Sequence, residues 1–214
     1  GDELILAKEL LPEVMRHKME IIEEFQGSDL VGKAYHPLFP DAINRGDSKT
    51  AWTIVEADFV TTTDGTGVVH TAVMYGEDDY SLGMEVGFPA QHTVGMDGKF
   101  IQGTHQELDG KYVKDCDSKI IDLLSNDGQL YREHIYTHDY PHCWRTDHPL
   151  LYYAMDSWFV RMTAVKEKII EFNSQVEWAP EWTGTGRVGE WLRNIKDWAI
   201  SRERYWGTPI PVWM

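Results

Sequence analysis

The stretch TTTDGTGVVHTAVMYGEDDY, from Thr61 to Tyr80, decides how this chain is interpreted. It begins with a turn in which Gly65 and Gly67 flank Thr66. Glycines permit tight turning and let a ligand approach the backbone closely. A small polar pocket lined by this turn is therefore one expectation, and an ordinary surface turn is the other.

The second half of the stretch carries two candidate functional side chains. Residues 68–73 have strand character and include His70. Asp79 falls in the predicted first turn of a helix, where acids suit the positive end of the dipole. Such a corner can aim His70 and Asp79 at one ligand. The alternative is a structural histidine in a strand and an acid that merely stabilises a helix start.

The segments GTGVVH and YGEDDY, within residues 65–80, resemble the signature of the editing domain inserted into isoleucyl-tRNA synthetases. His70 favours the isoleucine enzyme, because the valine and leucine relatives typically carry another residue there. Four further stretches are similar to family motifs in the same order: residues 27–39, 140–147, 157–161 and 197–211. Motifs in register over nearly the whole chain are far more specific than one glycine turn.

The resemblance implies a mainly β fold with peripheral helices (α+β), a barrel-like editing domain of the valyl/leucyl/isoleucyl-tRNA synthetase type. Residues 1–160 would form this editing domain, without its N-terminal threonine-rich strand. Residues 161–214 would form a helical segment and the strand that returns toward an absent catalytic domain.

The function implied by the resemblance is post-transfer and pre-transfer editing, in which valine is hydrolysed from mischarged tRNA for isoleucine. Asp79 would receive the α-ammonium of the valyl group and His70 would shape the pocket. Thr66 and the backbone of Gly65 and Gly67 would line it. Two alternatives remain open: an inactive structural or tRNA-binding module, and an editing domain from a valyl- or leucyl-tRNA synthetase.

The parent enzyme would ligate isoleucine to its tRNA with ATP and Mg²⁺. The family's ATP-binding signatures are missing from these residues, so we expect no cofactor here. The expected partners are the acceptor end of tRNA for isoleucine and the remainder of the synthetase. No apolar run approaches the ~20 residues of a membrane span, and no leader opens the chain, which predicts a cytoplasmic protein.

Charge and composition bear on these partners. The 214 residues carry a net charge of −15, and residues 1–160 hold 28 acidic but only 12 basic residues. Phosphate binding requires Lys and Arg, so most of the tRNA affinity would come from parts outside this chain. Two isolated cysteines, Cys116 and Cys143, suit a reducing compartment and predict no disulfide framework.

A metal site is the remaining possibility, because His134, His138 and His142 recur every four residues. Their surroundings indicate an extended segment, in which successive histidines lie about 13 Å apart at ~3.3 Å per residue. One zinc ion, with ligands at ~2 Å, cannot bridge that distance. We therefore predict no metal site. Catalysis by Cys143 would need a base at hydrogen-bonding distance, and a structural cysteine is the alternative.

Periodicity and caps predict the elements around the candidate site. Residues 51–60 and 67–73 read as strands. Helices are predicted at 77–85, closed by Gly87, and at 118–126, closed by Gly128. A helix is also predicted near 166–173. The i, i+3, i+4, i+7 spacing of residues 188, 191, 192 and 195 predicts another helix, with Trp191 in the core and not in a stacking platform for bases.

Overall fold

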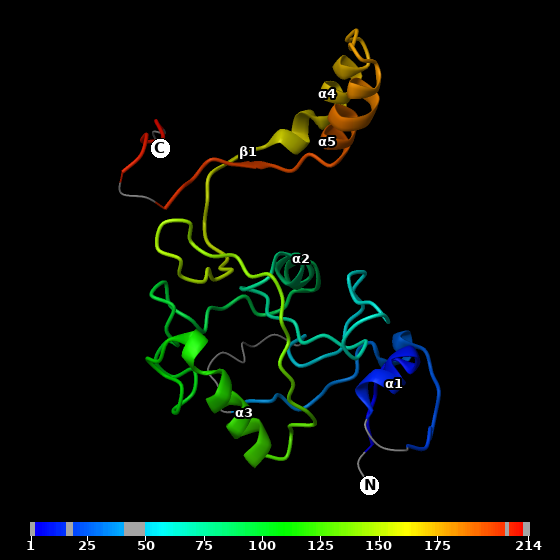
Figure 1. Ribbon diagram of the computed structural model, residues 1–214, viewed down its shortest axis with the longest axis vertical. Coiled ribbons are helices and arrows are strands. Elements are labelled where there is room, and N and C mark those ends of the chain that lie inside the picture. The colour runs from blue at the N-terminus through cyan, green and yellow to red at the C-terminus, as the bar shows by residue number, and fades with distance from the viewer. Residues whose placement is uncertain (1–2, 16–18, 41–49, 204–205, 212–214) are drawn as a thin grey trace. The chain divides into compact units, whose positions relative to one another are not determined.

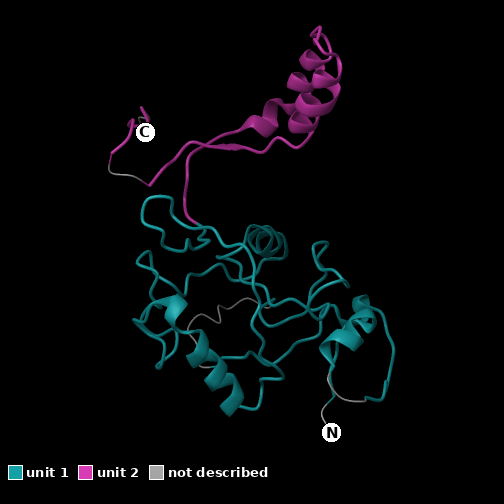
Figure 2. Ribbon diagram, in the orientation of Figure 1, with its two compact units in different colours: residues 1–154 teal, residues 155–214 magenta. Residues whose placement is uncertain are grey.

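The computed structural model describes residues 3–15, 19–40, 50–203 and 206–211. The chain divides into two compact units, residues 1–154 and 155–214, which are coloured separately in Figure 2. The candidate site residues all lie in the first unit.

The first unit consists mostly of irregular chain with short helices (Figure 1). Its elements are η1 (Lys8–Leu10), α1 (Leu11–Val14), η2 (Gly27–Leu30), α2 (Glu77–Val86), η3 (Val113–Asp115) and α3 (Asp117–Asn126). Its buried apolar side chains are Leu10, Val14, Leu30, Val94, Leu108 and Cys116. Cys116 is 1% exposed and its thiol donates to the Tyr112 carbonyl at 3.3 Å, which makes it a packing residue.

Helices α2 and α3 confirm the two helix predictions in this unit. In α2 the C-cap Gly87 is left-handed at φ 77°, a conformation that costs glycine little. Gly83 is buried on α2, and a Cβ on it would lie 2.7 Å from Val73 Cγ1. The absence of a side chain at Gly83 therefore lets α2 pack directly on the segment that follows His70.

The strand predictions at 51–60 and 67–73 are wrong as continuous elements. Only residues 52–54 pair, through Gly32 N–H to Ile54 O (2.8 Å), Ile54 N–H to Lys33 O (2.9 Å) and Tyr35 N–H to Trp52 O (2.9 Å). Trp52 has φ 60°, and Val60 N–H turns back to Ala57 O, so the chain bends at both ends of the pairing. The barrel-like fold class stays a prediction.

The second unit contains β1 (Phe159–Val160), η4 (Met162–Val165), α4 (Lys166–Asn173), the π-helical turn η5 (Thr183–Val188), α5 (Gly189–Arg193) and β2 (Trp198–Ala199). Strands β1 and β2 pair antiparallel with Phe159 opposite Ala199. The helix near 166–173 is confirmed. In the predicted helix 188–195, Leu192 and Ile195 are buried, but Trp191 is 63% exposed, so the core position predicted for Trp191 is wrong.

Candidate functional site

The glycine turn is held against the first described segment of the chain. Ala7 N–H donates to the Thr66 carbonyl at 2.8 Å. Gly65 and Gly67 both have positive φ, at 67° and 77°. A Cβ on Gly67 would lie 2.6 Å from Ala7 Cβ, whereas one on Gly65 would meet nothing within 4 Å. Gly67 is therefore required for close packing as well as for its conformation.

The Thr66 and His70 side chains face solvent. The Thr66 hydroxyl donates to Val68 O at 3.0 Å and accepts from Val68 N–H at 3.3 Å, which stabilises the turn. Within the described ranges the His70 ring makes no hydrogen bond or ion pair. Thr66 thus has a structural use, whereas His70 is available to a ligand.

Asp79 lies in the first turn of α2 and is half-buried. Its carboxylate folds back over Gly76, since Oδ2 lies 2.5 Å from the position that a Cβ on Gly76 would take. No hydrogen bond or ion pair reaches this carboxylate from the residues that the structure describes. The helix N-terminus supplies favourable partial charge but no dedicated partner.

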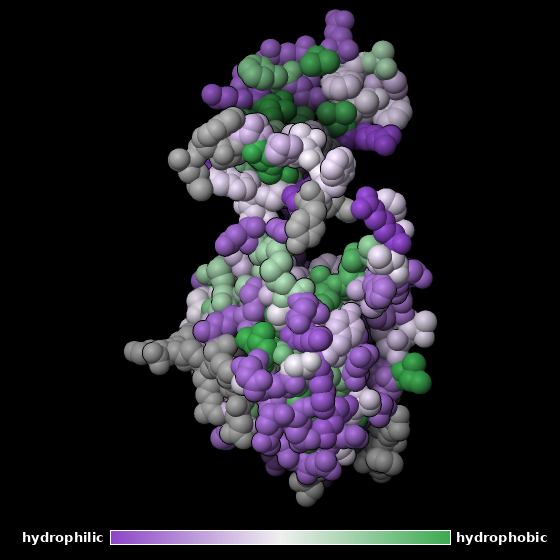
Figure 3. All heavy atoms as spheres, turned by 90° about the vertical axis from the view of Figure 1, so that its left-hand side faces the viewer, coloured by the Kyte–Doolittle hydropathy of each residue, from purple (hydrophilic) through white to green (hydrophobic). Residues whose placement is uncertain are grey.

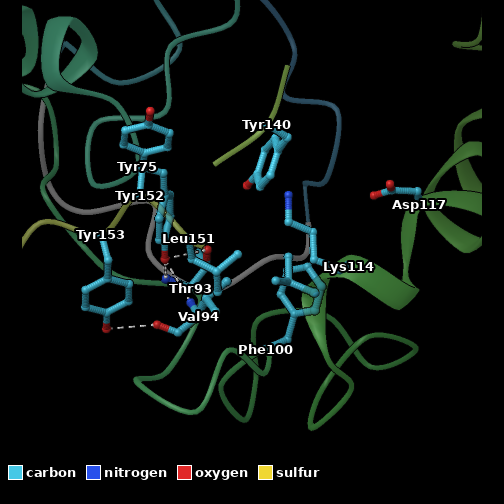
Figure 4. A pocket seen from close by; sticks show the side chains of 11 residues that line it. Tyr75, Thr93, Val94, Phe100, Lys114, Asp117, Tyr140, Leu151, Tyr152 and Tyr153 are labelled. Carbon is cyan, nitrogen blue, oxygen red and sulfur yellow. Dashed lines mark hydrogen bonds between the residues drawn. The ribbon is translucent and has the colours of Figure 1, made fainter. Parts of the chain in front are cut away.

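A cavity in the first unit is lined by other residues (Figure 4). It has a volume of about 350 Å³ and lies within the first unit. Neither it nor a second cavity is lined by Thr66, His70 or Asp79. Its lining residues are Tyr75, Thr93, Val94, Phe100, Val113, Lys114, Asp117, Tyr140, Leu151, Tyr152 and Tyr153.

Two tyrosines fix the deep wall of this cavity. The Tyr75 hydroxyl accepts from the backbone N–H groups of Thr93 (2.7 Å) and Val94 (2.8 Å). The Tyr153 hydroxyl donates to Val94 O at 3.0 Å. Burial, and secondly the neighbouring Tyr75, raises the pKa of Tyr153 above its ordinary value. Both hydroxyls therefore hold the backbone of Thr93 and Val94 in place.

The rim of the cavity carries the charged groups. The Lys114 ammonium lies 4.2 Å from the centre of the Tyr140 ring, a cation–π contact. Figure 4 shows Asp117 apart from Lys114, with its carboxylate on the side that faces the ammonium. Tyr152 completes the rim and is 64% exposed.

The sequence alone does not predict this cavity, because its walls come from segments that lie up to 78 positions apart along the chain. One local signal was present. Leu151, Tyr152 and Tyr153 form an apolar and aromatic run next to the motif at 140–147. The sequence alone does not predict that this run lies next to Tyr75.

A second cavity, of about 320 Å³, lies in the second unit between α4, η5 and α5. Trp178 lines it, and its indole Nε1 is buried without a partner in the described part of the chain. The cavity is also lined by Gly184, on which the indole packs so closely that any side chain there would collide with it.

Metal ligands do not gather in the described ranges, where no group of three or more His, Cys, Asp or Glu side chains could hold an ion. No helix in these ranges combines the length and the apolar character that crossing a membrane requires. On the face drawn in Figure 3, hydrophilic residues dominate the surface and apolar residues form small separate patches.

Comparison with known proteins gives the family. The sequence profile described as tRNA synthetases class I (I, L, M and V) matches residues 8–214. Isoleucine–tRNA ligase of Clostridium novyi (strain NT) is 46% identical over 213 residues, which cover 100% of this chain and 20% of the relative. The Clostridium tetani (strain Massachusetts / E88) protein of the same name is 48% identical over 210 residues, covering 98% of this chain and 20% of the relative.

A relative from another organism gives the same result. Isoleucine–tRNA ligase of Bdellovibrio bacteriovorus is 43% identical over 216 residues, covering 100% of this chain and 20% of the relative. The chain spans about a fifth of the length of these curated relatives. The profile match over residues 8–214 places the chain in the class I tRNA synthetase family of the isoleucine, leucine, methionine and valine enzymes.

Proposed function

We propose that this chain carries the editing site of an isoleucyl-tRNA synthetase and hydrolyses valine from mischarged tRNA for isoleucine. The same site would act before transfer, on the valyl adenylate. The relatives are named isoleucine–tRNA ligases, which supports the parent activity. The observation that carries the proposal is the Asp79 carboxylate, half-buried and without a hydrogen-bonding partner in the described ranges.

An editing site corrects for a physical limit on how well a binding pocket can distinguish isoleucine from valine. A missing methylene changes binding in an apolar pocket by only about 1–3 kcal/mol, and discrimination of valine by isoleucyl-tRNA synthetases is a well-known example of that limit. A second site that hydrolyses the smaller product removes the error. The resemblance in residues 65–80 supports such a site in this chain.

Asp79 is the residue on which the mechanism depends most. The substrate ester carries an α-ammonium next to the carbonyl that water attacks. A carboxylate that binds this ammonium makes a charge-assisted contact and fixes the carbonyl for attack. Asp79 is suited to this role because no described group neutralises it.

The glycine turn and His70 would complete the site. The exposed His70 ring would contact the valyl side chain or the terminal ribose. Thr66 and the backbone of Gly65 and Gly67 would line the pocket. Water would be the nucleophile, and the leaving group would be the ribose hydroxyl of the tRNA.

The remaining parts of the proposal concern the whole enzyme. ATP, Mg²⁺ and isoleucine would bind outside these residues, and no cofactor would be needed for hydrolysis. The acceptor end of the tRNA and the rest of the synthetase would be the partners, in the cytoplasm. The acidic first unit means that most phosphate contacts would be made elsewhere.

The test is Asp79→Ala, measured in this chain and in a chimera that carries residues 1–214 within the Clostridium novyi relative. Release of valine from mischarged tRNA should fall by the equivalent of about 2–4 kcal/mol of transition-state binding. Asp78→Ala is the matched control, since Asp78 is an exposed acid in the same helical turn. Isoleucine attachment by the chimera should persist in both variants.

The competing role of Asp79 is stabilisation of the helix start. Its loss would then lower the melting temperature and leave hydrolysis intact, at a cost of about 1 kcal/mol. Normal valine release by Asp79→Ala would defeat the proposal. Binding of tRNA without any hydrolysis by the parent chimera would favour a non-catalytic module instead.

A further inference from the structure

The first unit contains four pairs in which glycine follows aspartate: Asp64–Gly65, Asp97–Gly98, Asp109–Gly110 and Asp127–Gly128. In such a pair the backbone nitrogen of the glycine can attack the side-chain carboxyl of the aspartate and close a succinimide ring. Glycine favours this attack because it has no Cβ to obstruct the approach. The four pairs share this chemistry, so their surroundings decide which of them reacts.

In three of the pairs the glycine nitrogen is held by another residue's carbonyl. The bonds are Gly98 N–H to Gly95 O (2.9 Å), Gly110 N–H to Phe100 O (2.8 Å) and Gly128 N–H to Ser125 O (3.1 Å). Each nitrogen must leave its bond before it can attack. The Asp109 carboxylate is held as well, since it accepts from the backbone N–H groups of Gly103 and His105.

The pair in the glycine turn is different. Gly65 N–H donates to Asp64 Oδ1 at 2.8 Å, and the described ranges contain no other hydrogen bond from this nitrogen. Because a carbon–oxygen bond is ~1.2 Å long, Asp64 Cγ lies within about 4 Å of Gly65 N, near the distance of about 3–3.5 Å from which atoms react. Both residues are exposed. The nucleophile and its target are thus neighbours in a turn that is open to water.

We propose that Asp64 is a site of spontaneous modification, at which aspartate isomerises to isoaspartate. Gly65 N gives up its proton and forms a bond to Asp64 Cγ, and one carboxyl oxygen leaves as water. Water then opens the succinimide. Attack at the α-carbonyl leaves the main chain linked through Cγ, which is isoaspartate, whereas attack at Cγ restores aspartate. One water is lost and one is regained, so the step needs no other reactant.

Isoaspartate lengthens the main chain by one methylene in a turn that has little room to adjust. Ala7 N–H donates to Thr66 O at 2.8 Å, and Gly67 packs directly on Ala7. A longer link at residue 64 displaces Thr66 and Gly67 from these contacts. Valine release should therefore fall. This consequence rests on the proposed editing site, whereas the modification itself does not.

The modified turn also defines a partner by its chemistry. Isoaspartate carries a free α-carboxylate beside the main chain, and residues 61–66 are all exposed. An enzyme that transfers a methyl group from S-adenosylmethionine to this carboxylate would convert it to an ester. Gly65 N can then expel methanol and re-form the succinimide, from which water regenerates aspartate. The turn is thus a substrate for carboxyl-methylating repair.

The test is incubation of the 214-residue chain at neutral pH and physiological temperature. Electron-transfer fragmentation of its peptides then distinguishes isoaspartate from aspartate. Isoaspartate should accumulate at residue 64 at least about fivefold faster than at residues 97, 109 and 127, because each of those glycine nitrogens must first break a hydrogen bond. In concentrated urea, which removes the folded structure, the four rates should become similar.

Two variants locate the modification. Asp64→Glu should abolish it at this position, because a glutamate would have to close a larger ring. Asp127→Glu is the matched control, since Asp127 is an exposed acid before a glycine in the same unit, and it should leave accumulation at residue 64 unchanged. During incubation the unmodified chain should lose valine release in proportion to its isoaspartate, whereas Asp64→Glu should keep its own starting rate. Treatment with an isoaspartate carboxyl methyltransferase and S-adenosylmethionine should restore the loss.

Equal accumulation at the four positions of the folded chain would overturn the assignment, as would the same preference for residue 64 in urea. Full valine release by chains that carry isoaspartate at residue 64 would refute the effect on the turn. The two proposals fail separately. A fresh chain that releases no valine would contradict editing, and the isoaspartate content of its peptides would still decide the modification.

Discussion

Two aspartates of the first unit, Asp79 and Asp109, differ in whether their carboxylates have hydrogen-bonding partners within the described ranges. Asp109 accepts from Gly103 N–H at 2.6 Å, from His105 N–H at 2.8 Å and from the Gln102 side chain at 3.3 Å. These backbone bonds, that of His105 foremost, hold the pKa of Asp109 below its ordinary value. Asp79 accepts no hydrogen bond in the described ranges.

The difference separates a structural acid from one that is available to a ligand. Asp109 closes the loop at residues 102–109, where Thr104 is buried and its hydroxyl donates to Thr93 O at 3.1 Å. Asp79 lies at the edge of the glycine turn region, residues 64–79, which has its own attachment through Ala7. Sequence alone does not distinguish the two acids, since both follow glycine-containing turns.

The largest effect on stability is expected within the glycine turn, at Gly67. Gly67→Ala would force a Cβ to 2.6 Å from Ala7 Cβ at φ 77°. Left-handed strain of about 1–2 kcal/mol and overpacking of about 1–3 kcal/mol should add. Gly65→Ala should show the strain alone, because its Cβ would meet nothing within 4 Å. Urea unfolding of the two variants measures the difference.

Equal destabilisation by the two glycine variants would contradict the packing of the turn on Ala7. Valine release adds a second measurement. If the turn lines the editing site, Gly67→Ala should also lower hydrolysis at temperatures where the protein is still fully folded. Gly65→Ala should lower it less.

A smaller effect is expected at Asp109, and it depends on pH. A carboxyl whose folded pKa is depressed stabilises the protein above its unfolded pKa and loses that contribution as pH falls through the folded value. Asp109→Asn should therefore lower the melting temperature at pH 7. The difference from the unmodified chain should shrink progressively as pH falls below about 4, through the depressed pKa of Asp109. Thermal unfolding across pH measures it, and a constant difference would refute the assignment.

Asp79→Asn is the matched variant for Asp109→Asn. No described bond is lost when its carboxylate becomes an amide, so its melting temperature at pH 7 should stay close to that of the unmodified chain. Hydrolysis should fall because an amide cannot neutralise the ammonium. A fall in melting temperature equal to that of Asp109→Asn would make Asp79 a structural acid and reverse the comparison.

The sequence predicted those parts of the fold that depend on local chemistry. Helices α2 and α3 were found because acids open the first and glycines end both, at Gly87 and Gly128. The strand prediction at 51–60 is wrong because a strand depends on a distant partner, and the backbone bends at Trp52, where the short pairing begins, and again at residues 57–60. Trp191 was placed in the core by its spacing alone, but the neighbouring elements bury only Leu192 and Ile195.

The candidate site likewise combines features that local sequence predicts with features that depend on distant contacts. The family resemblance makes Asp79 and His70 the candidates, but it does not reveal that the Asp79 carboxylate has no hydrogen-bonding partner in the described ranges. Tyr and His side chains alternate at residues 136, 138, 140 and 142, and the ring contacts between them are seen only in the structure. The cavity itself depends on contacts between distant segments, which one sequence does not contain.

The smallest effect is expected at Thr66, and it tests whether a turn residue also contacts substrate. Its hydroxyl makes both described bonds to Val68, so Thr66→Val should cost about 0.5–1.5 kcal/mol of stability, and Thr66→Ser should cost little. If the hydroxyl serves only the turn, hydrolysis by the folded protein should be similar in both variants. If it also meets the tRNA terminus, Thr66→Val should lower hydrolysis by more than its stability loss explains, while Thr66→Ser retains activity. Urea titration together with valine release separates the two roles, and equal activity in both variants would leave Asp79 and His70 as the side chains that act on the substrate.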